Sequence, residues 1–186
     1  MNHRLVYVVG PSGAGKDSLL HWLVQHPPAH TDIQLARRTV TRPSMAGVEG
    51  DEAVDTTAFA ELLRAQAFAL HWSANGLHYG IRRHELAALT TGAWVLVSGS
   101  RAHLPVAQQH YPGLSAIHLQ ASTEVLRERL AARRRESGAE VEARLQRAVA
   151  FAPPAGAFCI TNDDDLASAG RQLKAHLFPA AALQPG

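Results

Sequence analysis

The feature that most constrains the fold is a glycine-rich stretch, GPSGAGKDS at residues 10–18, which follows the apolar run LVYVV at residues 5–9. A short continuous apolar run is typical of a strand that is buried on both faces of a parallel sheet. The stretch matches the phosphate-binding pattern G-x-x-x-x-G-K-[ST] except at its last position, where Asp17 replaces the hydroxyl residue. A strand, a glycine loop and a helix therefore predict a phosphate site near the N-terminus.

The rest of the chain alternates between apolar runs and segments with a helical pattern. Further strands are expected over residues 33–41, 68–72, 77–81, 93–98, 114–120 and 157–162. Helices are expected over 17–25, 56–67 with Thr56 or Thr57 as N-cap, 83–89, 103–110, 122–136, 140–150 and 166–177. Asn75-Gly76 between two apolar runs predicts a hairpin. The alternation predicts an α/β fold with a mostly parallel sheet flanked by helices, where ligands bind beyond the carboxyl ends of the strands.

A length of 186 residues, with 46% hydrophobic residues, predicts one domain over residues 1–178. Two segments interrupt the alternation. Residues 43–81 are expected to form an acceptor-binding flap, and residues 122–148 a lid that carries arginines. Residues 179–186 are expected to be a disordered tail.

Composition narrows the range of partners and compartments. A formal charge of +2 suits a small anionic substrate and is too weak to indicate nucleic acid or a membrane. No apolar run approaches the ~18 residues of a membrane helix, and no signal peptide is evident. The single cysteine, Cys159, excludes an internal disulfide and is expected to be buried. We expect a cytoplasmic protein, and a homodimer is one of the states that the sequence allows.

The glycine loop predicts specific contacts with a nucleotide. Its glycines let backbone N–H groups point inward at phosphate oxygens, and the helix that follows adds its positive end. Lys16 is expected to reach the β- and γ-phosphates. The expected nucleotide contacts are Gly10, Pro11, Ser12, Gly13, Ala14, Gly15, Lys16, Asp17 and Ser18.

Asp17 has two interpretations. A carboxylate is a strong Mg²⁺ ligand, and beside phosphates it is repelled unless a cation lies between them. Asp17 would then bind Mg²⁺ directly or through water. Alternatively, it offsets the helix dipole, an effect of about 0.3–1 kcal/mol. The metal interpretation is favoured, so the loop is expected to be altered and still functional.

Five segments resemble the guanylate kinase family and occur in that family's order. They are GPSGAGK at 10–16, TVTRP at 39–43, WSANGLHYG at 72–80, RERLAARRRE at 127–136 and ITNDDDL at 160–166. The resemblance covers nearly the whole chain. It implies a P-loop NTPase fold with a lid and a monophosphate-binding flap, and it places Asn162 near the adenine.

Several positions that recognise guanine in that family differ here. Met45 stands in place of a second arginine, His71 in place of a glutamate, and Ile81 in place of a serine or threonine, while residues 97–99 replace an acidic D-x-D. A site that hydrogen-bonds a base loses orders of magnitude in discrimination when such partners vanish. GMP is therefore not expected to be a substrate.

The stretches GKDS at 15–18, ARRTVTRP at 36–43, FALHWSANGLHYGI at 68–81 and VSGSRAHLP at 97–105 are similar to the ribose 1,5-bisphosphate phosphokinase family. This resemblance implies transfer of a phosphoryl group from ATP, with Mg²⁺, to the sugar phosphate ribose 1,5-bisphosphate. The attacking phosphate oxygen is already anionic, so positioning and charge neutralisation can suffice. A nucleoside monophosphate kinase and a non-catalytic binding module remain alternatives.

The remaining candidates lie at strand ends and on the lid. Lid arginines can neutralise transition-state charge, although arginine runs on helices are also common as solvated faces. Arg38 and Arg42 suit acceptor phosphate, and Asp51 suits a sugar hydroxyl or a solvated turn. The expected catalytic residues are Lys16, Arg42, Arg133 and Arg144, with Arg134 and Asn162 added to the nucleotide contacts. The expected substrate contacts are Arg38, Arg42, Asp51, Tyr79, Ser100 and Arg101.

Overall fold

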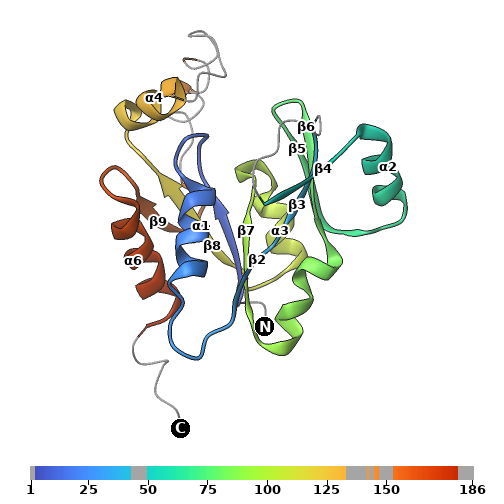
Figure 1. The fold of residues 1–186 in the computed structure, drawn as a ribbon, viewed down its shortest axis with the longest axis horizontal. Helices are drawn as coiled ribbons and strands as arrows, with labels where there is room; N and C mark the ends of the chain where they lie inside the picture. The colour runs from blue at the N-terminus through green and yellow to red at the C-terminus, as the bar shows by residue number, and fades with distance from the viewer. Residues whose placement is uncertain (1–2, 43–49, 133–141, 143–144, 147–152, 180–186) are drawn as a thin grey trace.

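The main sheet has five parallel strands with the strand of the glycine loop at its centre. A computed structural model describes residues 3–42, 50–132, 142, 145–146 and 153–179. The strand order is β2-β7-β1-β8-β9. The bounds are β1 Leu5–Val9, β2 Ile33–Leu35, β7 Trp94–Ser98, β8 Ser115–Gln120 and β9 Phe158–Thr161 (Figure 1). The predicted mostly parallel sheet flanked by helices is confirmed.

Alternation along β1 explains why both faces of the main sheet are covered. Val6 and Val8 belong to one hydrophobic cluster, and Leu5, Tyr7 and Val9 belong to the other. All five side chains are fully buried. The apolar run at residues 5–9 is continuous because each of its two faces has its own layer to pack against.

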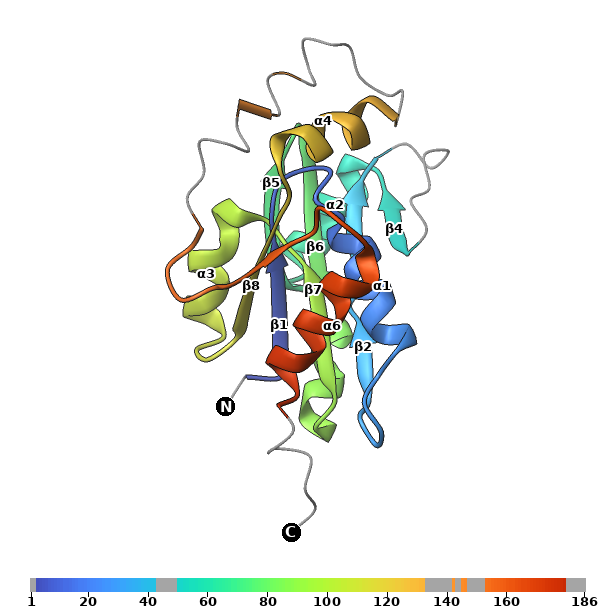
Figure 2. The ribbon, with the colours of Figure 1, turned by 90° about the vertical axis from the view of Figure 1, so that its left-hand side faces the viewer.

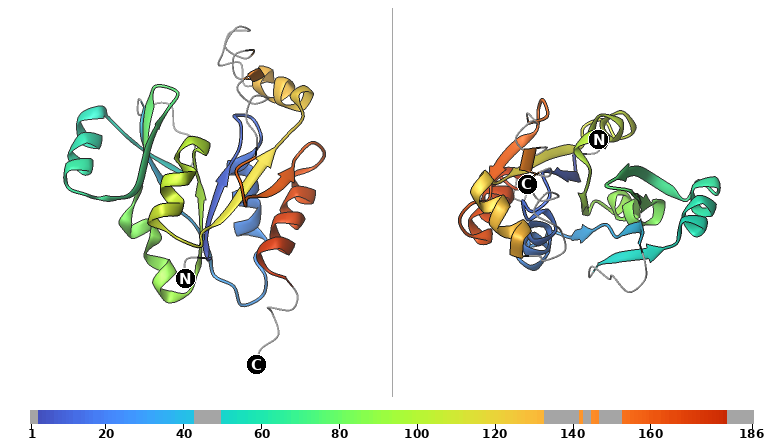
Figure 3. Two further views of the ribbon diagram at one scale, coloured as in Figure 1. Left: turned by 180° about the vertical axis from the view of Figure 1, so that it is seen from behind. Right: turned by 90° about the horizontal axis from the view of Figure 1, so that it is seen from above.

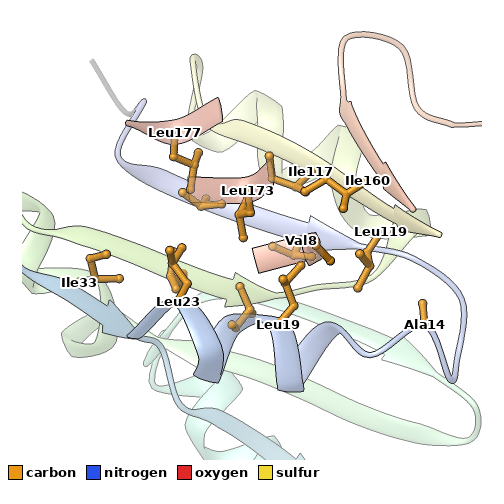
Figure 4. Packing of buried hydrophobic residues seen from close by; sticks show 14 of the residues in the cluster. Val8, Ala14, Leu19, Leu23, Ile33, Ile117, Leu119, Ile160, Leu173 and Leu177 are labelled. Atoms are coloured by element: carbon orange, nitrogen blue, oxygen red, sulfur yellow. The ribbon is translucent and has the colours of Figure 1, made fainter. Parts of the chain in front are cut away.

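The first cluster lies under α1 (Lys16–Gln25) and α6 (Leu166–Leu177). Figure 4 shows Leu19 and Leu23 of α1 pointing toward Val8 of the sheet and toward Leu173 of α6. The second cluster lies under α3 (Leu104–His110) and the 3-10 helix η1 (Arg83–Thr91). Figure 2 shows α3 on the opposite side of the sheet from α1 and α6.

A second sheet of four strands lies beside the main one, in the order β4-β3-β6-β5. Its elements are β3 Arg38–Thr41, β4 Asp51–Val54, β5 Phe68–Ala74 and β6 Leu77–Arg82, with α2 Thr56–Arg64 on its outer side (Figure 3). Leu70 and Ile81 reach the second hydrophobic cluster, so this sheet packs on the core. Asn75 and Gly76 both have positive φ, as a two-residue hairpin turn requires, and the predicted hairpin is confirmed.

Three expectations were wrong. The single strand expected over residues 33–41 is two strands, because after Ala36 the chain leaves β7 and enters the second sheet. The cap of α2 is Asp55, whose carboxylate accepts a hydrogen bond from the amide of Ala58 at 2.7 Å. Cys159 is exposed, because it alternates with the buried Ile160 along an outer strand of the sheet.

The described helices include none that is long and apolar enough to cross a membrane. The elements at the carboxyl end of the sheet are the 3-10 turn η2 (Arg101–His103) and α4 (Thr123–Ala132). Figure 2 shows α4 above the loop that follows β1. The expected domain bounds, flap and lid stay predictions.

Gly170 decides how closely α6 approaches α1. A Cβ at this position would overlap the indole ring of Trp22. Glycine in a helix ordinarily costs about 1 kcal/mol relative to alanine, so Gly170→Ala would stabilise an isolated helix. Here we expect Gly170→Ala to lower the free energy of unfolding by about 1–3 kcal/mol, because overpacking outweighs propensity.

Chemical denaturation of Gly170→Ala tests this expectation, with the exposed Arg171→Ala on the same helix as control. Combining Gly170→Ala with Trp22→Leu should restore most of the loss. Stabilisation by Gly170→Ala alone would contradict the packing described here.

Candidate functional site

The glycine loop joins β1 to α1 through backbone conformations that side chains resist. A Cβ on Gly10 would overlap the carbonyl oxygen of Leu119, and Gly15, the N-cap of α1, is left-handed with φ 92°. Lys16 folds back across the loop, and its ammonium donates to the carbonyls of Gly10 at 2.9 Å and Pro11 at 3.1 Å. The loop thus holds a positive charge over the open end of the central strand.

Two neighbouring elements fix the loop from behind. The amide nitrogen of Asn162, 3% exposed, donates to the carbonyl of Ala14 at 2.8 Å. Leu126 and Leu130 of α4 pack in the cluster that contains Ala14. Asn162 was expected to contact the nucleotide, and the structure places it where it supports the loop. Its contact with the nucleotide stays a prediction.

Asp17 faces the second sheet. Its Oδ2 lies 3.1 Å from Nη2 of Arg38, and the carboxylate also hydrogen-bonds the hydroxyl of Ser98. Burial raises the pKa of Asp17, but the charges of Arg38 and Lys16 together with the Ser98 hydrogen bond hold that pKa below its ordinary value. Asp17 is therefore negatively charged at neutral pH, at the first turn of α1.

Asp51 holds both arginines that were expected to bind acceptor phosphate. Nε of Arg38 lies 2.8 Å from its Oδ1, and Nη2 of Arg42 lies 2.9 Å from its Oδ2. Exposure of the three side chains is only 16%, 14% and 6% for Arg38, Arg42 and Asp51. Burial lowers the pKa of Arg38, but Asp17 and Asp51 hold it above its ordinary value. Arg38 is therefore charged at all relevant pH values.

Arg42 keeps one unfilled donor. Its Nε is buried and has no hydrogen-bond partner among the described residues. An unfilled buried donor on a guanidinium is costly, and a phosphate oxygen would satisfy it. Of the two arginines, Arg42 is the one with a buried guanidinium donor that has no partner among the described residues.

The expected substrate residues Tyr79 and Ser100 meet an aromatic group between the two sheets. The ring of Tyr79 stacks on Trp72, with centroids 5.6 Å apart and planes 4° apart. Trp72 lies 5.5 Å from the ring of His103, and the Tyr7 hydroxyl lies 3.2 Å from Nδ1 of His103. The same hydroxyl accepts the backbone amide of Ser100 at 3.2 Å.

Trp72, Tyr79 and His103 of this aromatic group lie in the motifs at residues 72–80 and 97–105, and Tyr7 is the member that no motif indicated. Burial raises the pKa of Tyr7, so its hydroxyl stays protonated and tied to Ser100 and His103. A tyrosine in an otherwise aliphatic strand was the available signal, because buried tyrosine hydroxyls usually have a partner. Ser98, at the end of β7, was expected only as one of several small residues near the sugar phosphate, and its hydrogen bond with Arg38 was missed.

His118 lies on β8 next to the end of β1, and Arg101 lies in η2 after β7. His118 is level with Val9 in the pairing of β8 with β1. Burial lowers the pKa of His118, and the positive charges of Arg101 and Lys16 lower it further. Arg133, Arg134 and Arg144 lie outside the described residues, and their roles stay predictions.

Glu52, the neighbour of Asp51, has a structural partner. Its Oε1 lies 2.7 Å from Nη2 of Arg82, and its Oε2 accepts from the hydroxyl of Thr39 at 2.7 Å. These contacts join β4, β3 and β6. The two adjacent acidic residues thus have different partners. Asp51 pairs with the arginines of the candidate site, and Glu52 links strands within the second sheet.

His118 generates a prediction about stability. The side chain is 3% exposed, and neither ring nitrogen has a hydrogen-bond partner among the described residues. Replacing a buried unsatisfied group by an apolar one removes a cost of about 1–3 kcal/mol. We expect His118→Leu to raise the free energy of unfolding at pH 7.5, measured by chemical denaturation.

The pH dependence of the same variant has a definite sign. Because the pKa of His118 is lowered in the folded state, the unfolded chain takes up the proton first as pH falls. Above the ordinary histidine pKa of about 6.5, protonation of His118 does not lower the free energy of unfolding. As pH falls below that value, the wild-type free energy of unfolding decreases. His118→Leu should lose less stability than wild type between pH 7.5 and 5.5, with the exposed His110→Gln as control. Equal losses would contradict this account.

Comparison with known proteins places the chain in a family. Residues 5–154 match the family model described as an AAA domain. Ribose 1,5-bisphosphate phosphokinase PhnN of Burkholderia pseudomallei (strain K96243) is 46% identical over 176 residues, which are 94% of this chain and 95% of that protein. The protein of the same name from Janthinobacterium sp. (strain Marseille) is 44% identical over 91% of this chain.

Some relatives are longer than this chain. The chain spans 38% of the Janthinobacterium protein and 42% of the one from Laribacter hongkongensis (strain HLHK9), which is 45% identical over 94% of this chain. Among solved structures, guanylate kinase from Anaplasma phagocytophilum superposes with a TM-score of 0.60 at 16% identity, covering 97% of this chain and 86% of that one. That likeness shows the fold alone. By the identity and coverage of the Burkholderia protein, the chain belongs to the ribose 1,5-bisphosphate phosphokinase family.

Proposed function

We propose that the chain phosphorylates ribose 1,5-bisphosphate with ATP, giving 5-phosphoribosyl 1-diphosphate and ADP. The observation that carries the proposal is the pair of arginines on Asp51 beside the phosphate loop. Lys16, Arg38 and Arg42 bring three positive charges against the carboxylates of Asp17 and Asp51. The excess of positive charge suits a polyphosphate donor and an acceptor that already carries phosphate.

The reaction suits a site without a general base. An oxygen of the acceptor's 1-phosphate attacks the γ-phosphorus of ATP, and the bond from that phosphorus to the oxygen bridging to the β-phosphate breaks. The electron pair of the broken bond leaves with ADP, and a new phosphoanhydride forms. The attacking oxygen is anionic at neutral pH, so the protein has to align two anions and neutralise their charge.

The residues at the guanine-recognising positions favour a sugar phosphate over GMP. Ile81 is fully buried and packs in the second hydrophobic cluster, where it offers nothing to a base. Ser98 is 4% exposed and already bonded to Asp17 and Arg38. His71 is exposed and replaces the acidic partner of guanine that the related kinases carry.

The donor side is proposed to bind ATP through residues 10–18, with Mg²⁺ as the counter-ion of its phosphates. Among the described residues, no group of three or more His, Cys, Asp or Glu could hold a metal ion. Asp17 is a hard oxygen donor next to Lys16, but Arg38 and Ser98 already engage its carboxylate. The site therefore fits a metal held through Asp17 poorly, unless the ion pair with Arg38 opens. When bound, Mg²⁺ would neutralise charge on the phosphates.

Substrate contacts are proposed for four residues and for the lid arginines. Arg42 is proposed to bind the acceptor phosphate, because it has an unfilled donor. Tyr79, Ser100 and Arg101 are proposed to line the rest of the acceptor site. The lid arginines Arg133, Arg134 and Arg144 are proposed to close over the transferred phosphoryl group. The proposed setting is the cytoplasm.

Product analysis tests the function. Incubation with Mg-ATP and ribose 1,5-bisphosphate should yield 5-phosphoribosyl 1-diphosphate and ADP, measured by ³¹P NMR and ion-exchange chromatography. Arg42→Ala should lower kcat/KM for the acceptor roughly 10- to 150-fold, the worth of a charged hydrogen bond. Arg171→Ala, an exposed arginine on α6, should leave it unchanged. Efficient turnover of GMP with none of ribose 1,5-bisphosphate would overturn the proposal.

A further inference from the structure

Asp17 is the residue at which the phosphate loop departs from its usual pattern, and its partner lies in the other sheet. Its carboxylate meets Nη2 of Arg38 at 3.1 Å and the hydroxyl of Ser98. Asp17 comes from the first turn of α1, Arg38 from β3, and Ser98 from the end of β7. Three separate elements therefore meet at this one carboxylate.

Every nitrogen of the Arg38 guanidinium is engaged. Nε donates to Oδ1 of Asp51 at 2.8 Å, and Nη1 donates to the hydroxyl of Ser98 at 3.1 Å. Nη2 donates to Asp17 at 3.1 Å and to Oδ2 of Asp51 at 3.3 Å. These contacts use four of the five guanidinium N–H groups, so little capacity is left for an acceptor phosphate. The contacts of Arg38 hold Asp17, Asp51 and Ser98 in fixed positions relative to one another.

The chain of contacts ends at Arg42. Asp51, fixed on one side by Arg38, accepts Nη2 of Arg42 at 2.9 Å on the other. Nε of Arg42 is buried and lacks a partner among the described residues. The same Asp51 carboxylate accepts hydrogen bonds from Arg38 and from Arg42. A displacement of Arg38 would therefore move Asp51 and, through it, Arg42.

We infer that Asp17 is a positioning residue for the acceptor: through Arg38 and Asp51 it fixes Arg42 beside the phosphate loop. This inference rests on the proposed function. A serine or threonine at position 17 is shorter and uncharged, so it could not neutralise Arg38. The carboxylate at the end of the phosphate motif thereby couples the donor loop to the acceptor arginine.

A double-mutant cycle on Asp17→Asn and Arg38→Gln tests the inference. Asp17→Asn removes the charge and keeps the shape, and it should raise the KM for ribose 1,5-bisphosphate about tenfold while the KM for Mg-ATP changes less than about twofold. The double variant should be little worse than Arg38→Gln alone, because both changes break the same contact. Asp17→Glu should recover part of the loss, and Asp17→Ser should not.

The matched control is Asp32→Asn. Asp32 is an exposed carboxylate just before β2, and no ion pair of its side chain occurs among the described residues, so its loss removes one surface charge away from the proposed site. It should leave the acceptor KM unchanged. Thermal unfolding of each variant verifies that the fold is retained, as expected for Asp17, whose side chain is 47% exposed.

The outcomes separate the inference from the proposed function. Absence of wild-type turnover with ribose 1,5-bisphosphate overturns the function. Wild-type turnover with additive effects of Asp17→Asn and Arg38→Gln overturns the inference alone. A raised Mg²⁺ requirement in Asp17→Asn, with the acceptor KM unchanged, also overturns it and makes Asp17 a metal ligand. A raised acceptor KM with an unchanged Mg²⁺ titration supports it.

Discussion

The ion-pair network around Arg38 is the constraint on which the site depends. Asp17 anchors Arg38 to the phosphate loop, and Asp51 anchors it to the second sheet. The main sheet can supply a phosphate-binding loop by itself, because β1 is buried on both faces and ends in glycines. Arg38 and Asp51, which hold Arg42, come from the second sheet. The side chains of Arg38, Arg42 and Asp51 are largely buried, and removing one partner of a buried ion pair is costly.

Two kinds of packing surround this network: aliphatic packing on the main sheet and aromatic packing between the two sheets. Aliphatic layers above and below the main sheet make the loop's supporting strand rigid, and α4 covers the loop through Leu126 and Leu130. The aromatic group of Tyr7, Trp72 and His103 fills the space between the main sheet and the β5–β6 hairpin. Polar contacts in this second region run through Tyr7, whose hydroxyl also meets Ser100. The proposed acceptor side thus contains aromatic rings and arginines, and the proposed donor side consists of the loop backbone and Lys16.

The sequence predicted the elements whose signals are local. The strand at residues 5–9, the turn at Asn75-Gly76 and the helix over 166–177 depend on patterns within a few residues, and the structure has all three. The single strand expected over 33–41 was wrong, because a change of partner sheet leaves no mark on apolar alternation. The pairing of Asp17 with Arg38 was missed for a related reason. Asp17 and Arg38 are 21 positions apart, and only the packing of the two sheets brings them together.

The most direct test of this account is a crystal structure with a non-hydrolysable ATP analogue, Mg²⁺ and ribose 1,5-bisphosphate. We expect the β- and γ-phosphates in the loop of residues 10–18, an acceptor phosphate within hydrogen-bond distance of Arg42, and Arg38 still bonded to Asp17 and Asp51. An acceptor bound away from Arg42, or a metal on Asp17 with Arg38 displaced, would contradict the account.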